Sequence, residues 1–293
     1  MEQLVQSVIL GLLIGGVYAL MASGLTLVFG VMKIVNVAHG AMLIAAAMIT
    51  WFIWNATGID PFLIAIPMTV MMFGIGWLLY RTVVARISGA SVSMSVLLTF
   101  GLALTVEGLL NVFAGNKFRS ATPSYFDESF RLGGLVFPKT QVYGAGVALI
   151  TLLALYLILS KTWTGRAIRA TSQNPTGAAL IGVSATGVAA LAFAIGTSTA
   201  GVGGSILSVL YPFFPASHYD WIARLLGIVV LGGMGSLAGA FVGSLFLGLA
   251  ETLTATYGSL QWASLVFYMA ILIVLLVRPQ GLFGSQLRED VAA

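Results

Sequence analysis

The residues best suited to chemistry in this sequence stand together in the stretch GRAIRATSQNP, residues 165–175. Two arginines, Arg166 and Arg169, are followed by the amides of Gln173 and Asn174. Guanidinium groups donate forked hydrogen bonds to carboxylates, and amides add donors and acceptors at protein interfaces. Charged residues make up only 8% of the chain. A basic, hydrogen-bonding stretch in such an apolar chain predicts contact with water or with a soluble partner.

Several kinds of catalytic chemistry have no counterpart in the sequence. There are no cysteines, which excludes disulfides, thiol catalysis and cysteine-ligated metals. His39 has no nearby carboxylate with which to hold a metal ion. The glycine-rich stretch 230–239 is not followed by the Gly-Lys-Ser/Thr of a phosphate-binding loop, and neither a nucleophile elbow nor HExxH occurs. The chain is therefore predicted to be no enzyme and to carry no metal or cofactor of its own.

The elements that must hold these residues are membrane-spanning helices. Hydrophobic residues make up 59% of the chain, and the mean hydropathy is +1.04. A helix needs about 20 apolar residues to cross the hydrocarbon layer. The sequence therefore predicts an all-α, polytopic transmembrane bundle that forms one domain, residues 1–293. About eight hydrophobic segments are predicted, at 4–23, 24–58, 61–80, 92–114, 141–160, 187–210, 225–257 and 262–277.

Lysine and arginine in the loops set the predicted orientation. Loops 81–91 and 161–186 carry basic residues without an acidic residue, as cytoplasmic loops do. The net charge of +4 fits this distribution and does not indicate nucleic-acid binding. The same orientation places 211–224 outside, where His218 and Asp220 are expected to be exposed polar residues or, alternatively, contacts for an external protein.

Two of the segments, 24–58 and 225–257, are too long for one crossing. Their interruptions, at 28–40 and 230–239, both contain Val-x-Gly-x-Met. Paired interruptions are typical of transporters with internal repeats, although a chain with 35 glycines also produces so short a match by chance. The pattern predicts two re-entrant segments. If both turn back, the N- and C-termini lie together in the cytoplasm. If 24–58 does not turn back, the N-terminus lies outside.

The first interruption contains polar side chains at membrane depth. Lys33, Asn36 and His39 are spaced three residues apart, so they share one face if the stretch is helical. Polar groups at this depth usually face the bundle interior or a water-filled path. Asn36 and His39 are predicted to line the path or to brace the re-entrant turn. A hydrogen bond between packed helices is the alternative.

The second interruption is rich in glycine. Gly232, Gly233 and Gly235 permit positive φ and predict a sharp turn or a path lined by backbone. Elsewhere, Glu107 is a candidate for a buried polar contact, either with protein groups or with the ammonium of a substrate. Glu251 stands near the end of its segment and is expected to reach water.

The polar loop 161–186 is predicted to contain two short helices. Alanine and arginine favour a helix from Gly165 onward, and Asn174 with Pro175 interrupts it. Proline then opens a further turn over 176–181. A short basic helix on the inner face of the membrane is suited to docking a soluble partner. A solvated loop that merely obeys the positive-inside rule is the alternative.

These stretches resemble a known family. GRAIRATSQNPTGAALIGV is similar to the cytoplasmic coupling loop of ABC importer permeases. In detail it resembles the high-affinity branched-chain amino acid permeases, which are related to urea and amide importers. SGLTLVFGVMKIVNVAHGAM (23–42), VVLGGMGSLAGAFVGSLFLGLAE (229–251) and RPQGLFG (278–284) resemble the same family in the same order.

The resemblance implies a permease subunit that carries branched-chain or related amino acids across a bacterial inner membrane. Cytoplasmic ATPase subunits would use the ATP and bind the coupling loop through Gly165, Arg166, Arg169, Gln173 and Asn174. A second, homologous permease subunit, which forms a heterodimer with the chain, and an external substrate-binding protein would complete the importer. A permease for urea or short amides is an alternative, as is an ATP-independent transporter or channel, since broken helices also occur there.

Overall fold

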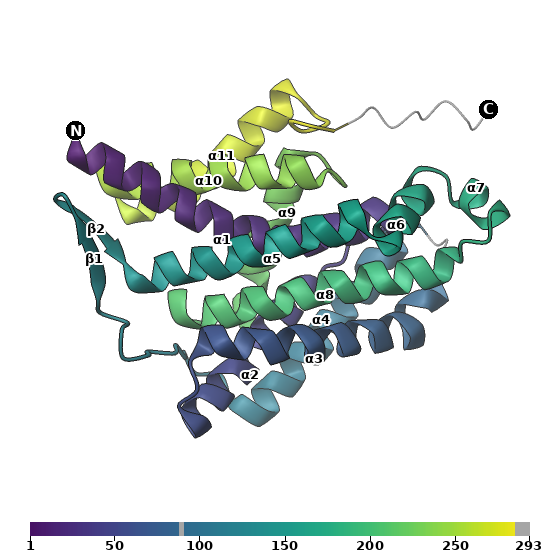
Figure 1. Cartoon of the computed structure of the whole chain (residues 1–293), viewed down its shortest axis with the longest axis horizontal. Helices are drawn as coiled ribbons and strands as arrows, with labels where there is room; N and C mark the ends of the chain where they lie inside the picture. Colours follow the sequence, from purple (N-terminus) through teal and green to yellow (C-terminus); the bar gives the residue numbers. More distant parts are fainter. Residues whose placement is uncertain (88–90, 285–293) are drawn as a thin grey trace.

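The computed structural model describes residues 1–87 and 91–284 as a helical bundle (Figure 1). Residues 88–90 of the predicted loop 81–91 and the end of the predicted domain, 285–293, lie outside the described part. The elements are α1 (Glu2–Met32), α2 (Ala38–Thr57), α3 (Pro61–Thr82), η1 (Val84–Ile87), α4 (Val92–Ala114), β1 (Ser129–Leu132), β2 (Leu135–Pro138), α5 (Lys139–Lys161), α6 (Trp163–Gln173), α7 (Pro175–Leu180), α8 (Ala185–Leu210), η2 (Pro215–Ser217), α9 (His218–Gly232), α10 (Leu237–Tyr257) and α11 (Leu260–Val277).

The predicted polytopic transmembrane bundle is confirmed. Within the described residues, eight helices are long and apolar enough to cross a membrane: α1 to α5, α8, α10 and α11. Helices α1 and α8 are the most buried of these and form the centre. Helix α8 packs against α1, α2 and α3, and α1 packs against α10 and α5 as well. Figure 1 shows the hairpin β1–β2 at one end of the bundle and α6–α7 at the other.

Helix boundaries differ from the prediction in the first two segments. The chain does not break between 4–23 and 24–58, because α1 continues to Met32. It ends at Lys33, whose φ of 55° is left-handed, and a non-helical stretch leads to α2. No charged residue or proline stands at 23–24, only Ser23 and Gly24, so the sequence offered no clear boundary there. Lys33, Asn36 and His39 therefore do not share a helical face.

The second long segment also differs from the prediction. Helix α9 begins at His218, inside the predicted outer loop 211–224, and ends at Gly232. It is only 15 residues long, about 22 Å at 1.5 Å per residue. Helix α10 follows after the predicted glycine interruption. Both interruptions are real breaks in helix, and their re-entrance stays a prediction.

The two ends of the described chain lie at opposite ends of the bundle. Near the start, the Val136 amide of the hairpin donates to Gln6 Oε1 at 3.4 Å. Near the end, the Phe283 amide donates to the Gly232 carbonyl oxygen at 3.1 Å, at the α6–α7 end. This arrangement differs from the alternative in which both termini lie together, and agrees with the one in which 24–58 does not turn back. Residues 4–32 form part of a single helix, α1.

A small structured region closes the hairpin end. Strands β1 and β2 pair antiparallel, with Ser129 opposite Pro138, a short hairpin that the all-α prediction did not include. Asp60 caps α3 by accepting a hydrogen bond from the Phe62 amide at 2.8 Å. Its carboxylate also accepts one from the Tyr125 hydroxyl. Burial and this hydrogen bond raise the pKa of Tyr125. These contacts join the loop after α4 to the start of α3.

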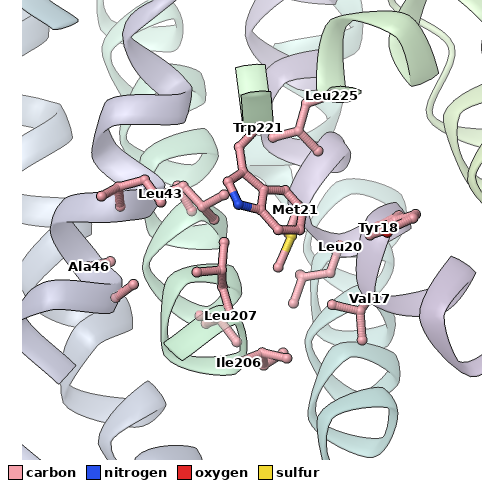
Figure 2. Close-up of a cluster of buried hydrophobic side chains, with 14 of the residues drawn as sticks. Val17, Tyr18, Leu20, Met21, Leu43, Ala46, Ile206, Leu207, Trp221 and Leu225 are labelled. Carbon is pink, nitrogen blue, oxygen red and sulfur yellow. The ribbon is translucent and has the colours of Figure 1, made fainter. Parts of the chain in front are cut away.

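The apolar core lies where α1, α2, α8 and α9 meet (Figure 2). Small residues allow the backbones to approach closely, as is usual between membrane helices. A Cβ added at Gly196 of α8 would lie 2.8 Å from the Gly24 carbonyl oxygen of α1. The labelled core residues are Val17, Tyr18, Leu20 and Met21 of α1, Leu43 and Ala46 of α2, Ile206 and Leu207 of α8, and Trp221 and Leu225 of α9.

Candidate functional site

The polar loop forms two helices joined at a sharp corner, as its sequence predicts. Thr162 caps α6 by accepting a hydrogen bond from the Gly165 amide at 3.2 Å. Helix α6 ends at Gln173, and Asn174 caps α7 by accepting a hydrogen bond from the Gly177 amide at 2.8 Å. Pro175 stands at the first position of α7, where its missing N–H costs nothing.

One side of α6 is packed firmly onto the bundle. Ala167 and Ile168 are buried in a cluster with Leu27 of α1, Leu159 of α5 and Ala192 of α8. A side chain at Gly165 would overlap the backbone of Leu159, with its Cβ 2.5 Å from the Leu159 Cα. Glycine is therefore required for α6 to fold back on the last turns of α5. A displacement of α6 must carry α5 with it, because interiors are close-packed.

The other side of this corner is open to a partner. Arg166, Gln173 and Asn174 are exposed. Beyond them, Leu180 at the end of α7 is 86% exposed and Ile181 is 76% exposed. The sequence analysis did not single out these two residues. Apolar residues that follow a proline turn in a cytoplasmic loop could have indicated a docking site. Together, the exposed side combines donors, amides and an apolar tip.

Both arginines are exposed, but of the two only Arg169 makes a side-chain hydrogen bond to the bundle among the described residues. Arg169 donates a hydrogen bond to the Leu159 carbonyl oxygen, near the end of α5. A cation there also complements the negative end of the α5 dipole. The segments at this end of the bundle carry basic residues and, within the described residues, no acidic ones: Lys33, Arg81, Arg86, Lys161, Arg166, Arg169 and Arg278.

The two interruptions meet at this same end. Gly30, just before the first break, lies beside Gly235 of the second, and a Cβ at Gly30 would be 3.4 Å from the Gly235 carbonyl oxygen. Gly233 has a φ of 97°, which favours glycine. Gly232 accepts a hydrogen bond from the Phe283 amide. The glycines thus form a tight joint between α1, α10 and the segment after α11.

Asn36 and His39 are buried inside the bundle. His39 donates from Nε2 to the Met21 carbonyl oxygen at 2.9 Å, midway along α1. The break itself is held by Thr99 of α4, whose hydroxyl accepts from the Val37 amide at 3.1 Å. The Asn36 Oδ1 has no hydrogen-bond partner among the described residues. These contacts place the start of α2 deep in the bundle.

Glu107 lies against the beginning of α9. Its Oε2 accepts hydrogen bonds from His218 Nε2 at 3.0 Å and from the Tyr219 hydroxyl at 3.1 Å. His218 is fully buried, which corrects the prediction that it is an exposed loop residue. Its backbone crosses α2 at Gly40, where a Cβ would lie 2.7 Å from the His218 carbonyl oxygen. The starts of α2 and α9 thus meet inside the bundle.

An ion pair joins α9 to α10 and α1. Arg224 Nη1 donates to Glu251 at 2.6 and 2.7 Å, and to the Tyr18 hydroxyl at 3.0 Å. Tyr18 in turn donates to Glu251 at 2.8 Å. The sequence predicted that Glu251 reaches water, because it stands near the end of its segment. Glu251 instead binds Arg224 and Tyr18. Loop charge counts gave no sign of this pair because Arg224 was assigned to the outer loop.

A cavity of about 680 Å³ lies between α1, α5, α6 and α10. Its lining is mostly apolar, with leucine the commonest residue and with Lys33 and Arg169 as the charged residues. Gly235 lines it as well. The other predicted path residues, Asn36, His39, Gly232 and Gly233, are not part of this lining.

Comparisons with known proteins give one consistent result. Residues 7–276 match the family described as branched-chain amino acid transport system, permease component. The high-affinity branched-chain amino acid transport system permease protein LivH of Escherichia coli K12 is 28% identical, over 96% of each chain. BraD of Pseudomonas aeruginosa, of the same description, is 27% identical over 98% of this chain and 97% of its own. A probable LivH of Methanocaldococcus jannaschii is 26% identical over 90% and 88%. No solved structure matches the chain significantly.

Proposed function

Because the chain belongs to the family of branched-chain amino acid transport system permease components, we propose that it is the membrane-spanning subunit of an ATP-driven importer. It carries branched-chain or related amino acids across the bacterial inner membrane, after an external binding protein delivers them. Separate cytoplasmic subunits bind and hydrolyse ATP. A second permease subunit, homologous and not identical, completes the translocation unit.

The observation that carries this proposal is the two-sided character of α6. Its buried side is packed with α1, α5 and α8. Its outer side and the corner after it present Arg166, Gln173, Asn174 and the exposed Leu180. A soluble ATPase subunit with acidic and amide groups around an apolar cleft complements this surface. The element is therefore attached rigidly on one side and available for docking on the other.

The mechanism follows from this arrangement. Closure of the ATPase subunits around ATP displaces α6 and α7. The buried Ile168 and the hydrogen bond from Arg169 to Leu159 transfer the displacement to the end of α5. The cavity beside α6 is bounded on its far side by Gly235 and its neighbours. Movement of α6 and α5 relative to this joint changes the width of the cavity, and alternation of such states is what import requires.

The polar groups of the bundle also suit an importer whose energy comes from separate ATPase subunits. A proton-coupled secondary transporter uses ionisable groups inside the membrane that bind and release the proton. Here Glu251 is paired with Arg224, and Glu107 accepts from His218. The chain carries no group of three or more metal-binding side chains among its described residues. We assign the energy source to ATPase subunits because α6 and α7 present an exposed surface suited to docking a soluble protein.

The test is site-directed cross-linking in this naturally cysteine-free chain. Single cysteines replace Arg166, Gln173 and Asn174, and the control cysteine replaces Ile66, an exposed residue of α3. Cross-links to a co-expressed ATPase subunit from the three test positions, altered by ATP and absent from the control, support the proposal. Full uptake by the isolated chain in vesicles without any ATPase contradicts it and favours an ATP-independent transporter.

A further inference from the structure

The start of α9 brings carboxylates to the surface of the bundle far from either end. Gly40, where α2 crosses His218, stands about 25 Å along α2 from its end at Thr57. Glu107 lies about 10 Å from the nearer end of α4, at Ala114. The hydrocarbon layer is about 30 Å thick. These groups therefore lie at membrane depth.

Two acidic side chains reach the surface at this depth. Asp220, in the first turn of α9, is exposed, and its carboxylate has no ion-pair partner within residues 1–87 and 91–284. The Glu107 side chain is 18% exposed, beside Tyr219, which is 41% exposed. Exposed residues of the same turns are Leu104 and Ala223. We call the surface formed by Leu104, Glu107, Tyr219, Asp220 and Ala223 the α4–α9 face.

Lipid does not suit this face. Ionisable side chains within membrane segments face a bundle interior or water and pair with one another, because hydrocarbon solvates no charge. Helix α9 is also too short to be counted among the candidate spans, and such half-helices are found where another protein element or a cavity covers them. Helix α4, which flanks it, is the least buried candidate span. The face therefore requires a polar environment, which a further protein surface or the water beside it supplies.

We infer that the α4–α9 face is the surface on which the second permease subunit packs, an inference that rests on the proposed function. The covering surface must supply hydrogen-bond donors or cations opposite Asp220 and Glu107. A two-fold contact between identical copies centred on this face would instead bring like carboxylates together, which is unfavourable at low dielectric. The partner here is therefore a different permease chain that presents lysine, arginine or hydroxyl groups.

Photo-cross-linking in the complete importer tests the inference. Leu104→Cys and Ala223→Cys carry a benzophenone maleimide, which captures whatever lies beside it. The matched control is Val70→Cys, also exposed on a membrane helix, α3. The expected adduct from L104C and A223C contains the second permease subunit, identified by mass spectrometry, and V70C gives lipid adducts. Lipid adducts alone at both test positions, or an adduct between two copies of this chain, would overturn the inference.

A charge variant gives a second readout. Asp220→Asn removes the charge and leaves the fold intact, because Asp220 makes no internal ion pair. We expect roughly three- to fifteen-fold less second permease to co-purify with D220N, the range given by polar contacts between membrane helices. Asp127→Asn, in the exposed loop before β1, is the same exchange and should have no effect. Equal recovery with D220N and D127N contradicts the inference.

Failure of this inference is distinguishable from failure of the proposed function. If the chain works with a second permease through another face, the complete importer still accumulates substrate with ATP, while neither Leu104 nor Ala223 captures that subunit. If the proposed function itself is wrong, no position captures a permease subunit, and the isolated chain accumulates substrate without ATPase.

Discussion

The guanidinium of Arg169 donates a hydrogen bond to the main-chain carbonyl oxygen of Leu159, and this contact fixes α6 to the end of α5. The sequence suggests the same role for Arg166 and Arg169, since both stand on one basic helix. The structure distinguishes them, because both are exposed but only Arg169 makes this hydrogen bond to the bundle. Docking and transmission of force are therefore assigned to different arginines.

Alanine substitutions of Arg166 and Arg169 should affect different steps, the binding of the ATPase subunit and the coupling of ATP hydrolysis to transport. Arg166→Ala removes an interfacial guanidinium, and we expect ATPase subunits to bind about ten-fold more weakly, as for a typical interfacial arginine. Arg169→Ala should leave binding nearly unchanged and lower the amount of amino acid carried per ATP. Binding is measured by titration of the ATPase subunit, and coupling in proteoliposomes. Equal losses of binding in both variants would show that the two arginines do not differ.

Gly165→Val should separate α6 from α5. Its side chain would overlap the Leu159 backbone, and we expect a loss of about 1–3 kcal/mol in the free energy of unfolding, as for an overpacked core. The control is Gly187→Val, in the first turns of α8, where a Cβ meets only the Ser184 side chain. Unfolding is followed in detergent by denaturant titration. A G165V variant as stable as G187V would show that α6 is not held against α5.

The contact between α1 and α8 predicts that alanine substitutions at two glycines of α1 differ in their effect on stability. A Cβ at Gly24 would lie 2.9 Å from the Gly196 Cα, whereas at Gly16 nothing lies within 4 Å. Gly24→Ala should therefore lower the thermal unfolding temperature. Gly16→Ala should leave it unchanged or raise it slightly, because alanine is favoured over glycine by about 1 kcal/mol inside a helix. Identical shifts in the two variants would contradict the close approach of α1 and α8.

Substitutions of Arg224 and Glu251 should have strongly non-additive effects on the free energy of unfolding. Removing either partner leaves a largely buried charge without its counter-ion, at a cost of about 3–5 kcal/mol in unfolding free energy. Arg224→Met combined with Glu251→Met removes both charges and should recover most of that loss. A double-mutant cycle, measured by unfolding in detergent, gives the coupling. Additive effects of the two substitutions would mean that the ion pair does not form.

Much of the fold could be predicted because membrane helices are recognised from the length and hydropathy of their segments. The corner between α6 and α7 was predictable for a local reason, since Asn174 and Pro175 act on the adjacent backbone alone. The glycine break at 233–236 was predictable for the same reason. The end of α1 was not placed correctly, because the stretch from Ser23 to Val28 contains no charge, proline or other signal that distinguishes a helix end from a helix interior.

The buried polar contacts lay beyond the sequence because they join distant segments. Glu107 and His218 are 111 positions apart, and their contact arises only because α4 and α9 flank the start of α2. Arg224 was counted as a loop charge, since a 15-residue helix such as α9 is too short to register as a span. Charge patterns place basic residues on one side of a membrane, but they do not reveal which carboxylate a buried arginine meets.

The most direct test of the account replaces residues 165–174 by an alternating Gly-Ser chain of equal length in the complete importer. The control is a helical version in which only the exposed Arg166 and Gln173 become alanine. The measured quantity is amino acid accumulated per ATP hydrolysed in proteoliposomes. The account predicts that ATP hydrolysis continues with the Gly-Ser chain while accumulation falls to the level without ATP, and that the helical control, assayed with excess ATPase subunit to offset its weaker docking, retains coupling. Undiminished accumulation with the Gly-Ser chain would contradict the claim that α6 transmits the force.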